Sequence, residues 1–168
     1  KTETVRWYRL AADQGHAPAQ FRMGFCCYRG IGREEDDGEA FSWFTKAAKQ
    51  DHSRAQYYLG KCYQYGYGVE QDIKKAVEQY RLATDQGDLD AQTELGFCYE
   101  LGRGVEEDKV EAVRCYLKAA EQNHARAQYF MGVCYENGYG TERDDVRAAS
   151  YYRMAAEQRD DSAQCKLG

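Results

Sequence analysis

Small and hydrophobic residues recur along the chain with the spacing of an α-helix. In the stretch that begins at residue 55, positions i, i+4 and i+7 hold Ala55, Leu59 and Cys62. The stretch that begins at Ala91 has the same spacing. This periodicity places the apolar side chains on one face of a helix, whereas a half-buried strand would alternate apolar and polar residues. The pattern therefore predicts helices over about residues 55–65 and 91–101.

The whole pattern returns every 36 residues without insertion or deletion. Internal repetition of this kind is typical of solenoid proteins, in which each repeat buries its hydrophobic face against its neighbours. We expect the whole chain, 1–168, to form a single repeat domain, and we expect it to be a segment of a longer protein. Counted from Ala19, the chain holds a partial repeat (second helix, 1–18), four complete repeats (19–54, 55–90, 91–126 and 127–162) and a partial repeat (first helix, 163–168).

Each repeat predicts two helices joined by a Gly-x-Gly turn. The first glycine suits the left-handed residue that ends a helix. An aspartate follows where the second helix starts, and its carboxylate can accept the free N–H groups of the first turn. In two repeats a glutamate lies three residues further on, at the capping-box spacing (Asp36/Glu39 and Asp108/Glu111). The four turns and aspartates are Gly30/Gly32 with Asp36, Gly66/Gly68 with Asp72, Gly102/Gly104 with Asp108, and Gly138/Gly140 with Asp144.

The second helix alternates small and aromatic residues along one stripe, as in Ala40, Phe44 and Ala47. A glycine also lies inside every first helix, although glycine there costs about 1 kcal/mol relative to alanine. A tight crossing of two helices would justify that cost, so we expect one at each of these glycines. They are Gly24, Gly60, Gly96 and Gly132.

The stretch from Ala55 to Gly87, AQYYLGKCYQYGYGVEQDIKKAVEQYRLATDQG, resembles the Sel-1-like repeat, a relative of the tetratricopeptide repeat. The shared pattern is A-x-x-x-L-G-x-x-Y-x-x-G-x-G-V-x-x-D-x-x-x-A-x-x-x-Y-x-x-A-A, and it is met along the whole chain with small departures, such as Cys27 and Thr84. The resemblance implies an all-α fold, a right-handed α-solenoid (superhelix) of antiparallel helix-turn-helix repeats. It also implies an adaptor or scaffold, since members generally act in this way in protein degradation, cell-wall synthesis, signalling and bacteria–host contact.

Charge and hydropathy exclude two kinds of partner. The net charge is −5, and nucleic-acid-binding proteins usually carry a basic stripe, so we expect no nucleic acid. The chain has no run of about 18 apolar residues, so we expect no direct membrane insertion.

Cysteine is the first candidate for chemistry, because four of the seven cysteines share one repeat position. Equivalent positions in stacked repeats lie too far apart to share a tetrahedral metal, and no Cys/His pair has zinc-finger spacing. We expect buried reduced thiols that pack as small hydrophobic residues. A bridge such as Cys98–Cys115 is the alternative, although an odd total fits a disulfide framework poorly. The cysteines are Cys26, Cys62, Cys98 and Cys134 at the shared position, with Cys27, Cys115 and Cys165 in addition.

The remaining candidates do not indicate catalysis. His16, His52 and His124 share a position in the turn before a first helix, where a capping or solvating group is commoner than a catalytic base. The Gly-x-Gly turn lacks the Lys and Ser/Thr of a phosphate loop. Some cysteine-rich relatives have been linked with β-lactam hydrolysis, but the S-x-x-K arrangement of a serine β-lactamase is missing. We predict that the chain is not an enzyme and binds no cofactor and no metal.

We expect function on the part of the first helices that the buried stripe leaves free. By analogy with the tetratricopeptide fold this is the concave surface, lined by repeat positions 3, 4, 7, 10 and 11. Aromatic residues and arginine, which dominate interaction hot spots, are dense there, and basic residues gather at the N-terminal end. The predicted partner-binding residues are Phe21, Arg22, Phe25, Arg29, Tyr57, Tyr58, Lys61, Tyr65, Glu94, Phe97, Leu101, Tyr129, Phe130, Val133 and Asn137.

These observations predict an adaptor that binds another protein or peptide, acidic at one end and apolar along its length. One alternative is a docking or regulatory region of a larger enzyme or membrane-associated complex. A second is that the aromatic residues at positions 3 and 7 only pack adjacent repeats together, and a third is self-association through uncapped terminal repeats. Abundant unpaired cysteine favours the cytoplasm, with the endoplasmic reticulum lumen or secretion as alternatives for the parent protein.

Overall fold

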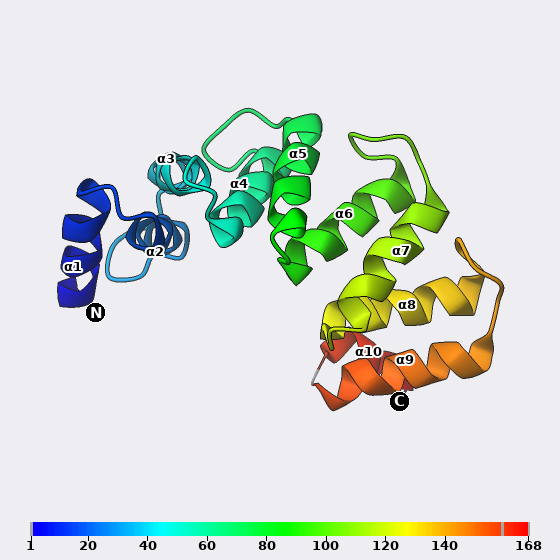
Figure 1. Ribbon diagram of the computed structural model, residues 1–168. Coiled ribbons are helices and arrows are strands. Elements are labelled where there is room, and N and C mark those ends of the chain that lie inside the picture. The colour runs from blue at the N-terminus through cyan, green and yellow to red at the C-terminus, as the bar shows by residue number, and fades with distance from the viewer. Residues whose placement is uncertain (1, 159, 168) are drawn as a thin grey trace. The chain divides into compact units, whose positions relative to one another are not determined.

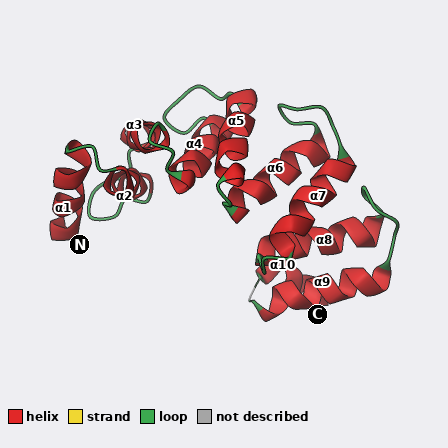
Figure 2. Ribbon diagram, in the orientation of Figure 1, coloured by secondary structure: helices red, strands yellow, loops and turns green. Residues whose placement is uncertain are grey.

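A computed structural model describes residues 2–158 and 160–167, which form ten α-helices joined by turns and loops (Figures 1 and 2). The first helices of the repeats are α2, α4, α6, α8 and α10, and the second helices are α1, α3, α5, α7 and α9. The predicted all-α fold of paired helices is confirmed. The helices are α1 (Thr2–Asp13), α2 (Ala17–Tyr28), α3 (Asp37–Ala48), α4 (Ser53–Tyr65), α5 (Ile73–Asp85), α6 (Leu89–Leu101), α7 (Lys109–Ala120), α8 (Ala125–Asn137), α9 (Asp145–Glu157) and α10 (Asp161–Leu167).

The chain divides into two compact units, Lys1–Asp88 and Leu89–Gly168, here called the N-terminal unit and the C-terminal unit. Within each unit, every helix packs against the helices that precede and follow it in that unit. Each unit has a core of its own, because a helix pair can bury its apolar stripe only against a neighbour. The two cores include Met23, Phe44 and Leu59, and Tyr116, Met131 and Cys134, respectively.

The predicted aspartate caps are present at the second helices of all four complete repeats, α3, α5, α7 and α9. In the first complete repeat, Asp36 accepts a hydrogen bond from the Glu39 N–H at 2.8 Å. The backbone N–H of Asp36 is donated to the Cys27 carbonyl at 3.1 Å rather than to Glu39. The capping box suggested by the Asp/Glu spacing therefore does not form there, because the end of the first helix already supplies the acceptor. The other caps are Asp72, Asp108 and Asp144.

An aromatic ring of the second helix lies directly over the glycine inside each first helix. A Cβ atom built on Gly96 would stand 2.7 Å from the ring of Tyr116, well inside van der Waals contact. The predicted tight crossings are thus confirmed, and the ring takes the space that a side chain would need. The four pairs are Gly24–Phe44, Gly60–Tyr80, Gly96–Tyr116 and Gly132–Tyr152.

The second glycine of the turn packs against the backbone of the preceding repeat, a contact that was not predicted from the sequence. Gly68 has a φ of +68°, and a Cβ atom on it would lie 2.1 Å from the carbonyl oxygen of Asp37. Gly140 stands in the same relation to Lys109, also at 2.1 Å. The turn of one repeat therefore rests on the first turn of the second helix in the repeat before it.

Buried glutamines tie neighbouring repeats together. In the second repeat, Gln86 donates to the Gln56 side chain at 2.6 Å, and Gln56 donates to the carbonyl of Ala48 in the preceding repeat at 3.5 Å. The fourth repeat forms the same arrangement with Gln128 and Gln158 at 2.7 Å. Each buried amide thus keeps a hydrogen-bond partner, as buried polar groups require.

We expect Gly96→Ala to lower the free energy of unfolding by about 1–2 kcal/mol, because overpacking against the Tyr116 ring outweighs the better helix propensity of alanine. The measurement is urea unfolding followed by circular dichroism. Gly38→Ala is the matched control, since a Cβ atom there meets only the Asp36 carboxylate at 3.5 Å. Equal stability of the two variants would contradict the assigned role of the ring.

Candidate functional site

We call repeat positions 3, 4, 7, 10 and 11 of α2 and α4 the first-helix face of the N-terminal unit. Tyr58 of α4 lies at its centre, with ring centroids 5.7 Å from Phe21, 5.6 Å from Phe25 and 5.3 Å from Phe44. Phe21, Phe25 and Tyr58 are half-buried, and such aromatic pairs contribute about 0.5–1.5 kcal/mol each beyond burial. Phe21 and Phe25, at positions 3 and 7, therefore pack on the adjacent repeat, as in the alternative considered from the sequence. Tyr58, at position 4, does the same, and all three keep part of their surface exposed.

Two further tyrosines of α4 differ in exposure. Tyr57 is 6% exposed, and its ring lies 6.1 Å from that of Tyr80 in α5, so it packs inside its own repeat. Tyr65 is 48% exposed at the end of α4 and stacks on Tyr67 at 5.5 Å. Tyr65 therefore offers a partner much more surface than Tyr57 does.

Basic side chains surround these rings. The Arg54 guanidinium carbon lies 5.0 Å from the ring centre of Tyr57 and 5.7 Å from that of Tyr58. The Lys61 ammonium lies 5.9 Å from both ring centres, and Arg22 of α2 lies 6.0 Å from that of Phe21. Cations within about 6 Å of a ring centroid are attracted to its π face. The first-helix face of the N-terminal unit is consequently aromatic and positively charged.

Arg29, the remaining predicted basic residue, has a different environment. It is exposed at the end of α2 and lines a shallow pocket of about 270 Å³ with Glu35 and Asp37. Two carboxylates therefore lie beside its charge.

His52 caps α4 beside this face. Its Nδ1 accepts a hydrogen bond from the Ala55 N–H at 3.2 Å, and its ring stacks on Phe21 at 5.0 Å. Burial of the ring lowers the pKa of His52, and the nearby charges of Arg22 and Arg54 lower it further. His124 caps α8 in the same way, so the predicted capping role is confirmed at these two positions. His16 occupies the equivalent site before α2, where its side chain makes no capping hydrogen bond.

The C-terminal unit builds its first-helix face from the same positions of α6 and α8. Phe130 of α8 takes the place of Tyr58, with ring centroids 4.9 Å from Tyr116 and 6.1 Å from Phe97. The ring of Tyr129 lies 5.7 Å from that of Tyr152 in α9. Among the predicted residues of this face, Phe97, Tyr129, Phe130 and Val133 are half-buried, and Leu101 and Asn137 are exposed.

Glu94, also predicted on this face, lies in the interior. It is 3% exposed, and its carboxylate pairs with the Arg126 guanidinium at 2.6 Å. A buried carboxylate needs such a partner because its removal from water is costly. Asp90, one turn earlier in α6, lies 3.1 Å from Nε2 of His124.

In three of the four complete repeats the side chain at position 10 is engaged inside its own repeat, where a tyrosine hydroxyl of the second helix donates to it. The distance is 2.7 Å for Tyr116 to Glu100 and for Tyr152 to Glu136. Burial, followed by the neighbouring carboxylate, raises the pKa of both hydroxyls. In the second repeat Tyr80 donates to Gln64. Position 10 thus contributes less to the exposed face than the sequence suggested.

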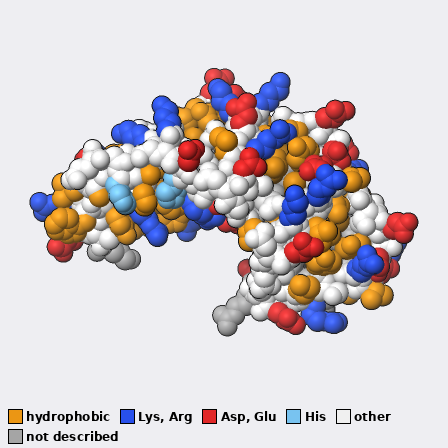
Figure 3. All heavy atoms as spheres, viewed as in Figure 1, with side chains coloured by type: hydrophobic (Ala, Val, Ile, Leu, Met, Phe, Trp, Pro, Cys, Tyr) orange, Lys and Arg blue, Asp and Glu red, His pale blue; other side chains and the backbone are white. Residues whose placement is uncertain are grey.

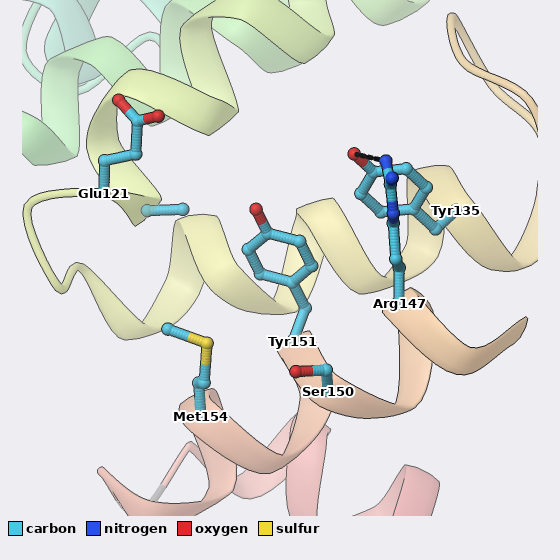
Figure 4. A pocket seen from close by; sticks show the side chains of 7 residues that line it. Glu121, Tyr135, Arg147, Ser150, Tyr151 and Met154 are labelled. Carbon is cyan, nitrogen blue, oxygen red and sulfur yellow. Dashed lines mark hydrogen bonds between the residues drawn. The ribbon is translucent and has the colours of Figure 1, made fainter. Parts of the chain in front are cut away.

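A separate pocket of about 370 Å³ lies among α7, α8 and α9 of the C-terminal unit (Figure 4). Figure 4 shows Tyr151 and Met154 rising from α9 on one side and Tyr135 of α8 beside Arg147. The rings of Tyr135 and Tyr151 stack at 5.7 Å, and the Arg147 guanidinium hydrogen-bonds the Tyr135 hydroxyl at 3.5 Å. Arg147 also pairs with Asp144 at 3.3 Å. Arg147, the cation of this pocket, therefore already has a hydrogen-bond partner and an ion-pair partner within the C-terminal unit.

The six buried cysteines lack the features of reactive groups. Each of the seven is a thiol, and all except the exposed Cys165 are buried, which confirms the expected packing role for six of them. Burial raises the pKa of Cys62, Cys98 and Cys134 to about 12, so they stay protonated near neutral pH. A thiol needs the thiolate form to act as a nucleophile or metal ligand. Among the described residues, no group of three or more His, Cys, Asp or Glu side chains is placed to hold a metal.

Comparison with known proteins agrees with this architecture. The sequence model of the Sel1 repeat matches residues 1–16, 17–52, 53–88, 89–124 and 125–160. The chain belongs to the Sel1 repeat family. These matched repeats begin two residues before the alanines used to number the sequence, at the residues where α4, α6 and α8 begin. A search of curated proteins found no match.

Two solved structures are similar over nearly the whole chain. A Sel1 repeat protein from Oxalobacter formigenes is 34% identical with a TM-score of 0.93, covering 96% of this chain and 64% of that protein. A protective antigen present in uropathogenic Escherichia coli strains, which displays the same fold, is 37% identical with a TM-score of 0.89, covering 97% of this chain and 35% of that protein. An immunity protein from Pseudomonas aeruginosa, 23% identical with a TM-score of 0.64, shares the fold over 95% of this chain and 58% of its own. The chain thus spans less than two thirds of each of these proteins.

Among the residues that the structure describes, no helix is both long enough and apolar enough to cross a membrane.

Acidification is expected to destabilise the N-terminal unit through His52. Because its folded pKa is lowered, the unfolded chain binds the proton more readily. The stability that the neutral ring provides is complete above the ordinary histidine pKa of 6.5 and is lost as the pH falls through the folded value. Urea midpoints at about pH 7.5 and 5.5 should therefore fall more in the wild type than in His52→Asn, which retains a capping side chain. An equal fall in both proteins would contradict this role.

Proposed function

We propose that this chain is a non-catalytic adaptor that binds another protein or peptide through its first-helix faces. The observation that carries the proposal is the exposed aromatic and aliphatic surface of these faces, which in the N-terminal unit is combined with cations. Tyr65 and Leu101, at the same position of α4 and α6, are 48% and 47% exposed. Tyrosine is enriched among the hot-spot residues of protein interfaces, and an exposed leucine beside half-buried aromatic residues adds apolar surface that a partner can bury.

The half-buried rings have a structural role as well as a partner-binding one in this proposal. Tyr58 and Phe130 support the packing of neighbouring repeats, so they can present only an edge to a partner. The exposed residues around them, namely Arg22, Tyr65, Leu101 and Asn137, supply most of the accessible surface together with the half-buried Lys61. Tyr57 and Glu94 are too deeply buried to make the first contact.

The same surface is compatible with a docking or regulatory role. Because the related structures extend beyond the part that this chain matches, the adaptor surface can equally serve as a docking or regulatory region of a larger enzyme or membrane-associated complex. We further propose a cytoplasmic location, which the six buried thiols support, since thiols persist in reducing compartments.

Photo-crosslinking tests the adaptor proposal directly. A benzophenone amino acid placed at Tyr65 or at Leu101 should crosslink to a different protein in cells of the source organism. The same amino acid at Met154, which is 41% exposed beside the pocket of Figure 4, is the control and should give little product. Products found only at Met154 would indicate that the partner binds at the pocket of Figure 4 instead. Crosslinks only between two copies of this chain would replace the adaptor with self-association.

A matched pair of variants tests the same surface without a probe. Tyr65→Ala/Leu101→Ala should weaken binding of the partner found by crosslinking by roughly 30-fold, since the two side chains together are worth about 2 kcal/mol. Val110→Ala/Val146→Ala removes side chains that are 60% and 82% exposed on second helices, and it should leave binding unchanged. Circular dichroism must first show equal helicity in all proteins. Equal binding by both variants would contradict the proposal.

A further inference from the structure

The two first-helix faces differ in charge although they share one repeat pattern. Repeat position 4 holds Arg22 and Tyr58 in the N-terminal unit, and it holds Glu94 and Phe130 in the C-terminal unit. Position 7 holds Lys61 in α4 and Val133 in the equivalent repeat of the C-terminal unit. The same helical framework therefore presents cations in one unit and apolar or acidic side chains in the other.

In the C-terminal unit the charges at these positions are satisfied internally. Arg126 pairs with the buried carboxylate of Glu94 at 2.6 Å, and Asp90 lies 3.1 Å from the His124 ring. This face consequently has no free cation to offer from these residues.

In the N-terminal unit the cations beside the aromatic rings are Arg22, Arg54 and Lys61. In the part of the chain that the structure describes, only Arg54 of these three has a carboxylate partner. Arg54 pairs with Asp88 at 3.2 Å, and the Asp88 side chain is just 2% exposed, so this carboxylate is directed inward. Among the described residues, no carboxylate lies within ion-pair distance of Arg22 or Lys61. These two cations lie over the rings of Phe21, Tyr57 and Tyr58 instead.

Three cations thus surround one cluster of aromatic rings, in a chain whose net charge is −5. On the part of the surface that Figure 3 shows, hydrophobic side chains are interspersed with basic and acidic ones. A ligand that satisfied this surface would carry carboxylates spaced between apolar or aromatic groups, because cations that lack internal partners attract opposite charge.

We propose that the first-helix face of the N-terminal unit binds an acidic peptide segment that also carries aromatic or leucine side chains. The segment's carboxylates pair with Arg22 and Lys61, and its apolar side chains pack on Phe25, Tyr58 and Tyr65. This proposal rests on the adaptor function and names the chemistry of its partner.

Selection from a random peptide library tests which peptide sequences this face prefers. A phage-displayed library of random dodecapeptides is selected on the whole chain, and on Arg22→Gln/Lys61→Gln as a parallel target. Peptides enriched on the wild type should carry net negative charge together with Phe, Tyr, Trp or Leu, and they should not be enriched on the double variant. Enrichment of neutral or basic peptides, or no enrichment at all, would overturn the proposal.

Fluorescence anisotropy with one enriched peptide then measures the effect of each charge. Arg22→Gln/Lys61→Gln should weaken binding about tenfold, and about 0.3 M salt should weaken wild-type binding similarly. Lys74→Gln/Lys118→Gln removes two exposed cations from second helices and should bind as the wild type does. Arg22→Glu/Lys61→Glu should reverse the preference toward a peptide in which lysine replaces each acidic residue.

The outcomes separate this inference from the adaptor function. If photo-crosslinking at Tyr65 captures a partner while the double variant binds the acidic peptide as tightly as the wild type, the adaptor function stands and the charge recognition is wrong. If an oligo-dT probe competes for the same site more strongly than the acidic peptide, the ligand is a phosphate backbone and the proposal is overturned. Tight peptide binding that depends on Arg22 and Lys61 supports the inference even where no cellular partner is captured.

Discussion

The contact between an aromatic ring and a bare stretch of helix backbone is the constraint on which the rest of the structure depends. In each complete repeat the ring of the second helix occupies the space above a glycine of the first, and it would overlap any side chain placed there. This contact fixes the distance between the paired helices. The ring at its centre is fully buried in Phe44, Tyr80 and Tyr116, so the neighbouring side chains must arrange themselves around it.

That arrangement decides which residues are left for binding. Aromatic side chains at repeat position 4, such as Tyr58 and Phe130, are drawn toward the buried ring of the preceding repeat. They become half-buried joints between repeats instead of freely exposed anchors. The exposed residues are Arg22 and residues at the ends of the first helices, such as Tyr65 and Leu101. This is why we propose that the electrostatic difference between the two units bears more on partner choice than the aromatic content does.

The architecture of this chain was largely predictable from its sequence because the repeat is regular. The helix pairs, the aspartate caps and the close crossings at Gly60 and Gly96 all follow from residue types at a fixed spacing. The burial of Glu94 did not follow, since its partner Arg126 is 32 residues away and only the fold brings them together. The glutamine network was recognisable in principle, because glutamine recurs at repeat position 2 in Gln20, Gln56, Gln92, Gln128 and Gln164, but its role required knowing which carbonyl lies opposite. The exposure of each side chain on a first-helix face likewise depends on packing against the neighbouring repeat, so it could not be predicted from one repeat alone.

The glutamine and glycine contacts between repeats have a consequence for how such chains change length. Gln56 and Gln128 reach back to main-chain carbonyls, and Gly68 and Gly140 rest on main-chain atoms. A main-chain atom is offered by any neighbour, whatever side chains that neighbour carries. A gene can therefore duplicate or delete a whole repeat and leave each new junction chemically intact. Length can vary in steps of one repeat, while the side chains on the outside change independently.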